Sequence, residues 1–320
     1  DRAWHRQTGE VGWLDAQGNP EHLLGGRGGS PVLAADGRPL RRRDRKSIAL
    51  LNQVALGGSA RFAQDRLRLN LGLRAPFFER DLHQYCHTPV ANPGGDPWCT
   101  SQAPVGGPDR QGHVRLEGSD GLEFVPPYSG TKKYHQLLPG IGIALFPGER
   151  SGQVFLGYAK GFSAPRNYNL YSRQIVDARP ETTDTFELGY RHQGESSLAT
   201  ATLWKTSYAN RIVSAWDEEQ GIATDRNVGD VRLWGADTSV ELELSRGFSL
   251  YGTASYLRSR MQRDIRIDAT TIAPTAGKHL VETPAVMLGA RLQYRHAGFR
   301  LGLQAKHVCR RWANDVNSAR

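Results

Sequence analysis

The chain has 320 residues, of which 36 are glycine and only 38% are hydrophobic. This composition excludes a helical membrane protein, because no stretch approaches the roughly eighteen consecutive apolar residues that a spanning helix needs; a β-barrel is not excluded, since its strands alternate apolar and polar residues. The formal net charge of +9 is dispersed along the chain, so no nucleic-acid partner is expected.

The first predicted elements are a loop and a pair of strands. Residues 1–45 are expected to form a loop, and the basic run Arg41–Lys46 is expected to be a solvated segment beside the first strand. Side chains alternate between the two faces of a strand, so an alternating pattern predicts a strand. Segment 61–74 has this pattern, with Leu67, Leu69, Leu71 and Leu73 on one parity and Arg66, Arg68, Asn70, Gly72 and Arg74 on the other.

The same alternation continues along the chain and predicts an all-β protein of about ten antiparallel strands. Besides 46–56 and 61–74, the predicted strands lie around 141–145, 154–158 and 186–190 and over 198–208, 234–244, 248–256, 286–294 and 299–305. Aromatic residues near strand ends are candidates for the interfacial rings of a membrane barrel, with core packing as the alternative. These aromatic residues are Tyr158, Tyr190, Tyr208, Trp234 and Tyr256.

Short and long connections alternate between the predicted strands. Short turns are expected at 57–60, 147–151, 193–196, 245–247 and 295–298, and long loops at 75–133, 165–180, 209–230 and 258–280. Antiparallel strands put alternate connections at opposite ends, so all tight turns would lie at one rim and all long loops at the other. This is the outer-membrane arrangement, and a soluble β-sandwich or propeller has no reason to segregate loop lengths in this way.

The pattern of cysteines and histidines has two interpretations, of which a disulfide is preferred and no metal site is expected. A disulfide between Cys86 and Cys99 would staple the long loop 75–133 and suits an oxidising compartment. The rival is a metal site, because His83, His87 and His113 supply further ligand types, but no C-x-x-C spacing supports it. No hydrolase or phosphate-binding motif is present, so neither an enzyme nor a cofactor is expected.

Three sequence motifs resemble those of TonB-dependent outer-membrane receptors. The first runs from Gly161-Phe162-Ser163-Ala164-Pro165 to Asn169-Leu170-Tyr171, and the second is Arg179–Arg191, with Pro180, Glu181, Glu187 and Gly189 at the matching positions. The third is Asn227-Val228-Gly229 followed by Gly235-Ala236-Asp237 and Glu241. Each motif alone is weak, but the three occur in the order that the family uses.

The resemblance implies a transmembrane β-barrel in the outer membrane of a Gram-negative bacterium, with periplasmic short turns and extracellular long loops. Family barrels have about 22 strands and an N-terminal plug, so the ten strands here are expected to be an incomplete barrel segment, without the plug, its TonB box and the closing strands. Residues 1–45 would be an extracellular loop, 46–311 the barrel strands, and 312–320 the start of a further loop.

The implied function is active uptake of a ferric siderophore or a similar scarce nutrient chelate. The implied partners are that chelate, outer-membrane lipid and the TonB-ExbB-ExbD complex, and a monomer is expected. The alternatives are an adhesion or phage-attachment barrel without transport and a soluble β-sandwich binding protein. Arginine and aromatic side chains in two loops could contact an anionic chelate or could simply be solvated: Arg166, Tyr168, Tyr171, Arg173, Arg211, Trp216 and Arg226.

Overall fold

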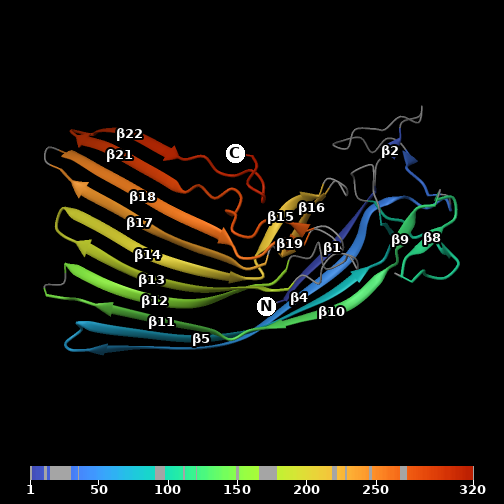
Figure 1. Ribbon diagram of the computed structural model, residues 1–320, viewed down its shortest axis with the longest axis horizontal. Helices are drawn as coiled ribbons and strands as arrows, with labels where there is room; N and C mark the ends of the chain where they lie inside the picture. Colours follow the sequence, from blue (N-terminus) through green and yellow to red (C-terminus); the bar gives the residue numbers. More distant parts are fainter. Residues whose placement is uncertain are drawn as a thin grey trace.

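The fold is dominated by a single 12-stranded antiparallel sheet (Figure 1). The structure is a computed structural model, and it describes residues 2–10, 13–14, 30–34, 36–90, 98–110, 112–119, 121–148, 151–165, 179–217, 222–227, 229–244, 247–266 and 272–319. Strands follow one another across the sheet in the order β1-β4-β5-β11-β12-β13-β14-β17-β18-β21-β22, with β10 also paired to β5. Within the described residues, no helix is long and apolar enough to cross a membrane.

Four smaller sheets lie in the connections between the strands of the main sheet. The main sheet contains β1 (Arg2–Glu10), β4 (Arg41–Phe62), β5 (Leu67–Gln84), β10 (Tyr128–His135), β11 (Leu138–Leu145), β12 (Gly152–Ser163), β13 (Glu181–Gln193), β14 (Ser197–Ala209), β17 (Val231–Glu243), β18 (Phe248–Met261), β21 (Val286–His296) and β22 (Phe299–Val308). The smaller sheets pair β2 (Trp13–Leu14) with β3 (Ser30–Pro31), β15 (Ile212–Asp217) with β16 (Ile222–Asn227), and β19 (Ile265–Arg266) with β20 (Ile272–Ala273), and they join β6 (Thr88–Pro89), β9 (Glu123–Val125), β8 (Val114–Leu116) and β7 (Pro104–Val105).

The all-β antiparallel fold is confirmed, and each of the ten predicted strands is present, but the main sheet has two further strands, β1 and β10. The ten predicted strands correspond to β4, β5, β11, β12, β13, β14, β17, β18, β21 and β22. Figure 1 places the tight turns that join neighbouring strands of the main sheet at one end, on the left, and the long connections at the other. We call these the turn end and the loop end. The sheet is not closed into a barrel, as expected for an incomplete barrel segment.

The N-terminal loop prediction was wrong in two respects. Strand β1 lies within the expected loop 1–45 and pairs with residues 41–50 of β4. The basic run Arg41–Lys46 is not a solvated segment, since it belongs to β4, where Asp44 and Arg45 are each only 8% exposed. Both errors have one cause: β1 lacks apolar alternation, so its pairing with the basic end of β4 leaves no signal in hydrophobic periodicity.

Two predicted connections also differ from the structure. The first tight turn lies at Ala63–Arg66 rather than at 57–60, because Ala63, Gln64 and Asp65 adopt positive φ while Gly57 and Gly58 stay in the β4–β5 ladder. The loop expected over 75–133 is shorter, since β5 continues to Gln84 and β10 begins at Tyr128. The extension of β5 mixes apolar and polar residues without a two-residue period, so the strand is not visible in the sequence.

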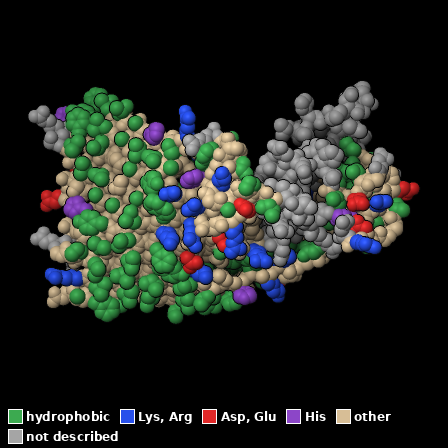
Figure 2. All heavy atoms as spheres, viewed as in Figure 1, with side chains coloured by type: hydrophobic (Ala, Val, Ile, Leu, Met, Phe, Trp, Pro, Cys, Tyr) green, Lys and Arg blue, Asp and Glu red, His purple; other side chains and the backbone are tan. Residues whose placement is uncertain are grey.

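The two faces of the main sheet differ in chemistry. One face, called the apolar face, carries large exposed side chains that stand opposite one another across strands, such as Leu188 beside Leu156 and Leu203. Figure 2 shows these apolar side chains gathered over the turn-end part of the sheet. The opposite, polar face carries Glu187 and Asp237, whose partners across the ladder are Trp204 and Thr202.

Four of the five predicted interfacial aromatics share the apolar face. Tyr158 packs beside Phe186 with ring centroids 4.8 Å apart, and Trp234 packs beside Tyr256 at 5.5 Å. Tyr190 stands on the same face, 44% exposed. Tyr208 does not fit the interfacial prediction, because it lies on the polar face opposite Val231 and packs into a buried cluster described below.

Gly235 on β17 provides a test of this packing. A Cβ at this position would collide with the Tyr256 carbonyl oxygen and lie 2.6 Å from the Trp204 ring, which is held by a 2.6 Å hydrogen bond from its Nε1 to Asp237 Oδ2. We expect Gly235→Ala to lower the free energy of unfolding by about 1–2 kcal/mol because the collision involves backbone. Urea titration of the chain folded in detergent micelles measures this loss.

The matched control is Gly252→Ala on the neighbouring strand β18. A Cβ there would meet nothing within 4 Å, so the same change of residue type should leave stability unaltered or raise it slightly. Equal effects of the two substitutions would contradict the role given to the Trp204–Gly235 contact.

Candidate functional site

The loop end is organised around a buried carboxylate at the start of β13. Glu181 is 7% exposed, and its two oxygens accept hydrogen bonds from Arg211 Nη1 at 2.8 and 3.1 Å. The Ile212 backbone N–H donates to the same carboxylate at 2.7 Å. Arg211 also lies over the Tyr208 ring, 4.5 Å from its centroid. The start of the β15–β16 hairpin is therefore fixed to β13 by a charged and largely buried contact.

Asn227 adds a second set of contacts at this position, and we call Glu181, Arg211 and Asn227 with their partners the loop base. The Asn227 side-chain amide donates to the carbonyls of Asn210 at 2.7 Å and Arg179 at 3.1 Å, and its oxygen accepts from the Arg179 N–H at 2.9 Å. Asn210 and Gly229 have φ values of +53° and +79°, which asparagine and glycine tolerate best. One side chain thus holds together the exit of the 165–180 connection and both ends of the β15–β16 hairpin.

A small apolar core lies at the loop end of the polar face. Thr275, which is fully buried, supports it by accepting a hydrogen bond from the Ile265 N–H at 3.0 Å and donating to the Arg263 carbonyl at 3.1 Å. The cluster joins β17, β18, β19 and the segment before β21, so these connections form a packed unit. Its buried members are Val231, Leu233, Met261, Ile265 and Leu280, with Trp204, Tyr208, Leu257 and Ala273 packed against them.

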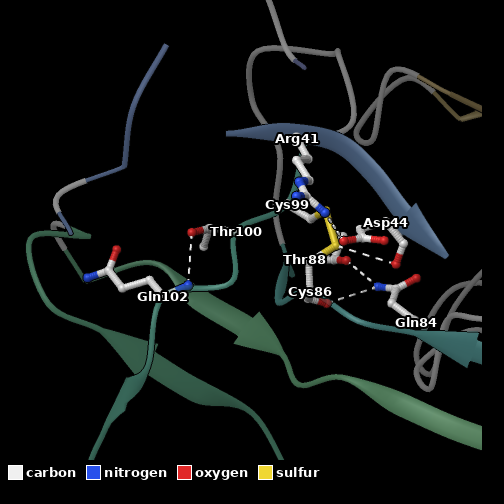
Figure 3. Close-up of a disulfide and its surroundings, with 8 residues drawn as sticks. All are labelled: Arg41, Asp44, Gln84, Cys86, Thr88, Cys99, Thr100 and Gln102. Carbon is white, nitrogen blue, oxygen red and sulfur yellow. Dashed lines mark hydrogen bonds and ion pairs between the residues drawn. A yellow bond between two sulfur atoms is a disulfide. The ribbon is translucent and has the colours of Figure 1, made fainter. Parts of the chain in front are cut away.

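The long connection between β5 and β10 contains its own folded unit, the loop sheet, defined as β6–β9 with residues 85–127. Cys86 and Cys99 are joined in a disulfide at its base, and each is only 2% exposed (Figure 3). Cys99 exchanges backbone hydrogen bonds with Arg41 at 2.6 and 2.9 Å, which ties the loop sheet to β4. Behind the disulfide, Trp98 packs edge-on against the buried Phe124, with centroids 5.6 Å apart.

The sulfur atoms of both cysteines are used in the disulfide, so they are not metal ligands in this structure. His87, between them in sequence, exchanges backbone hydrogen bonds with Thr100 at 2.7 and 3.0 Å. Burial lowers the pKa of the His87 imidazole, and a hydrogen bond with the Thr100 backbone opposes part of that effect. Burial at this position therefore favours the neutral form of the imidazole.

Comparison with known proteins identifies the family. The chain matches the family model described as TonB dependent receptor-like, beta-barrel, over residues 4–319. The chain belongs to this family. Family members are outer-membrane transport receptors of Gram-negative bacteria, not enzymes. No curated protein matches the sequence.

Solved structures of TonB-dependent receptors share the fold at low sequence identity. The ferric yersiniabactin uptake receptor FyuA from Yersinia pestis is 15% identical with a TM-score of 0.62, and 88% of this chain matches 37% of FyuA. The siderophore receptor PiuA from Acinetobacter baumannii is 15% identical with a TM-score of 0.54, over 88% of this chain and 48% of PiuA. The copper transporter OprC is 14% identical with a TM-score of 0.57, over 86% of this chain and 37% of OprC. The chain therefore spans less than half the length of these receptors.

The structure gives the family motifs local roles. Gly161 and Phe162 lie in the last three residues of β12, Pro165 is fully buried, and Pro180 precedes Glu181 of the loop base. Gly189 leaves room for the Phe155 ring on the neighbouring strand, because a Cβ there would collide with it, and Glu187 faces Gly157 across the same ladder. Some motif residues therefore lie at strand ends and loop exits, whereas Glu187 and Gly189 lie within the β12–β13 ladder.

The residues predicted to contact a ligand are only partly described. Arg166, Tyr168, Tyr171 and Arg173 lie outside the described residues, as do the side chains of Trp216 in β15 and Arg226 in β16. Arg211 is described, and its guanidinium is engaged by Glu181. The clamp by Asn227 was not predicted, although the motif that contains it was identified, because its three contacts link backbone positions that are far apart in sequence.

Proposed function

We propose that this chain contributes the barrel wall and the ligand-capturing loops of a TonB-dependent receptor that takes up a ferric siderophore or a similar metal chelate. The supporting observation is the loop base: the 165–180 connection and the β15–β16 hairpin, which carry the ligand candidates, share the Glu181–Arg211 and Asn227 contacts. Two loops that start from one fixed base can present side chains to the same ligand.

The remaining parts of the proposal follow from the chemistry of the sheet. The apolar face is suited to contact outer-membrane lipid, since its exposed leucines would otherwise lie in water. The polar face would line the barrel interior, where a plug would sit, and the TonB-ExbB-ExbD complex would supply the energy for release into the periplasm. A soluble β-sandwich would instead bury the apolar face against a second sheet.

The ligand contacts are proposed at arginine and aromatic side chains of the two loops. Arginine offers planar, permanently charged donors to carboxylate or catecholate oxygens, and aromatic rings offer flat contact area. Arg211 is proposed to act indirectly, by holding the hairpin against Glu181. The proposed contacts are Arg166, Tyr168, Tyr171, Arg173, Trp216 and Arg226.

The test is a binding titration on the receptor produced from its gene in outer-membrane vesicles. Ferric catecholate, hydroxamate and phenolate siderophores are titrated while tryptophan fluorescence is recorded. We expect one class to bind with a dissociation constant in the micromolar range or below, and the double substitution Arg166→Ala/Arg173→Ala to weaken it at least about tenfold, equivalent to about 1.4 kcal/mol.

The control is Arg300→Ala in β22, an exposed arginine close to the tight turn at the opposite end of the sheet. It should bind the siderophore as the wild type does. Absence of binding by every ferric chelate, together with attachment of phage or host cells to the same vesicles, would overturn the uptake proposal in favour of an adhesion barrel.

A further inference from the structure

Three side chains of the types that ligate metal ions lie close together in the loop sheet, away from the loops proposed to bind the chelate. His113 Nδ1 lies 3.5 Å from Asp109 Oδ2 and 3.6 Å from Glu123 Oε2, and one ligand atom from each of the three residues lies within 4.8 Å of the others. His113 is 7% exposed, whereas the two carboxylates are about a third exposed. The imidazole is therefore fixed at the edge of the core, with the carboxylates between it and solvent.

These distances fit the ligand set of a tetrahedral metal ion. Two ligand atoms that are each about 2.0–2.1 Å from a tetrahedral metal lie roughly 3.4 Å apart. The His113 Nδ1 distances to the two carboxylate oxygens are close to this value. Small side-chain rotations would thus bring all three atoms to one ion, and a solvent molecule could complete the coordination.

Other hydrogen bonds orient both carboxylates toward the imidazole. Asp109 Oδ1 accepts the His113 backbone N–H at 2.8 Å, while Oδ2 points toward the ring. Glu123 Oε1 accepts from Arg115 Nη2 at 3.3 Å, while Oε2 points toward the ring. Bonds of this kind, in which one oxygen is held and the other is presented, are typical of carboxylates that support metal binding.

The backbone around the cluster is held independently of any ion. Asp109 N–H donates to the His113 carbonyl at 2.8 Å and Gly112 N–H to the Asp109 carbonyl at 3.0 Å, which closes a tight turn. Glu123 belongs to β9. That strand pairs with β8, which begins at the residue after His113. The turn and the strand are thus preorganised to supply ligands from two segments of chain.

We propose that Asp109, His113 and Glu123 form a site for a divalent transition-metal ion of the Zn²⁺ class in the loop sheet. One imidazole and two carboxylates suit Zn²⁺ better than Mg²⁺ or Ca²⁺, which prefer all-oxygen sites with more ligands. The bound ion would pin the turn at 109–113 to β9. The site does not depend on the proposed uptake function, because none of its residues belongs to the proposed chelate-contacting loops.

The test uses the receptor produced from its gene, purified in detergent and stripped of metal with EDTA. Titration with Co²⁺ should produce the visible absorption bands of a tetrahedral site, and Zn²⁺ should abolish them by displacing Co²⁺. Zinc affinity is measured by competition with a chromophoric chelator, and we expect saturation at a single ion per chain. A large excess of Mg²⁺ should not compete.

Isosteric variants separate metal binding from folding. Asp109→Asn and Glu123→Gln keep the shape of each side chain, and each should weaken zinc binding at least about tenfold; His113→Ala should weaken it more. The matched control is His83→Ala, since His83 Nε2 contacts the single carboxylate of Asp81 at 3.1 Å and should bind no ion. Protease resistance of the loop sheet checks that each variant is folded.

Two results would overturn the proposal. One is a wild-type chain that takes up no more Co²⁺ or Zn²⁺ than His113→Ala. The other is full affinity in the folded Asp109→Asn and Glu123→Gln variants, which would show that the three side chains form only an ion-pair cluster.

Discussion

Replacing Glu181 with glutamine is expected to loosen the loop base and to cost about 2–3 kcal/mol in the free energy of unfolding. The carboxylate is 7% exposed, and its loss leaves the Arg211 guanidinium without its charged partner. Breaking a buried ion pair from one side costs about 3–5 kcal/mol, and the partial exposure of Arg211 lowers the estimate somewhat below that range. Urea titration measures the loss in the free energy of unfolding. Faster hydrogen exchange of the backbone amides of residues 209–217 would show that the loss arises at the loop base.

An exposed ion pair provides the control for this substitution. Glu79 pairs with Lys133 at 3.1 Å, but both side chains are well exposed, so Glu79→Gln should change stability by less than about 1 kcal/mol. If Glu181→Gln were no more damaging than Glu79→Gln, Glu181 would not be the anchor of the loop base.

Removing the disulfide should have the largest effect, and it should be confined to the loop sheet. The bond closes a chain segment with a sequence separation of 13, for which loop-closure entropy predicts a loss of about 3 kcal/mol when the link is removed. We expect Cys86→Ala/Cys99→Ala to make residues 85–127 rapidly cleavable by protease while the main sheet remains resistant. Limited proteolysis followed by mass spectrometry measures both.

The third cysteine is a suitable control for that experiment. Cys309 is a free thiol beyond β22, remote in sequence from the loop sheet, so Cys309→Ala should leave the protease pattern of residues 85–127 unchanged. Equal protection of the double variant and the wild type would mean that packing around Phe124 alone holds the loop sheet.

Hydrophobic periodicity was sufficient for the strands that have one apolar face. Segments such as Leu67–Leu73 alternate because one side of the sheet is apolar and the other polar, so the pattern itself encodes the strand. Strand β1 and the end of β5 escaped prediction because neither of their faces is continuously apolar. Their positions depend on backbone pairing with β4, and hydrophobic periodicity does not record such pairing.

The candidate site was less accessible to prediction than the sheet. Glu181 and Asn227 belong to recognisable motifs, but their partners Arg211 and Arg179 are brought to them by the register of other strands. The Asp109–His113 spacing is visible in the sequence, whereas the contribution of Glu123 depends on β9 folding back beside β8. Sequence patterns report local chemistry, and contacts between segments require the fold.

The length of β5 determines how far the loop sheet stands from the apolar part of the main sheet. Strands β10 and β11 both pair with β5, which continues past the last exposed apolar residue, Phe77, to Gln84. At about 3.3 Å per residue, that extension adds about 20 Å, and Figure 1 shows the loop sheet carried at its far end. In a receptor embedded in a membrane, this projecting ribbon would be open to an approaching antibody or phage, so sequence change that evades such attackers should concentrate there and spare the strands below.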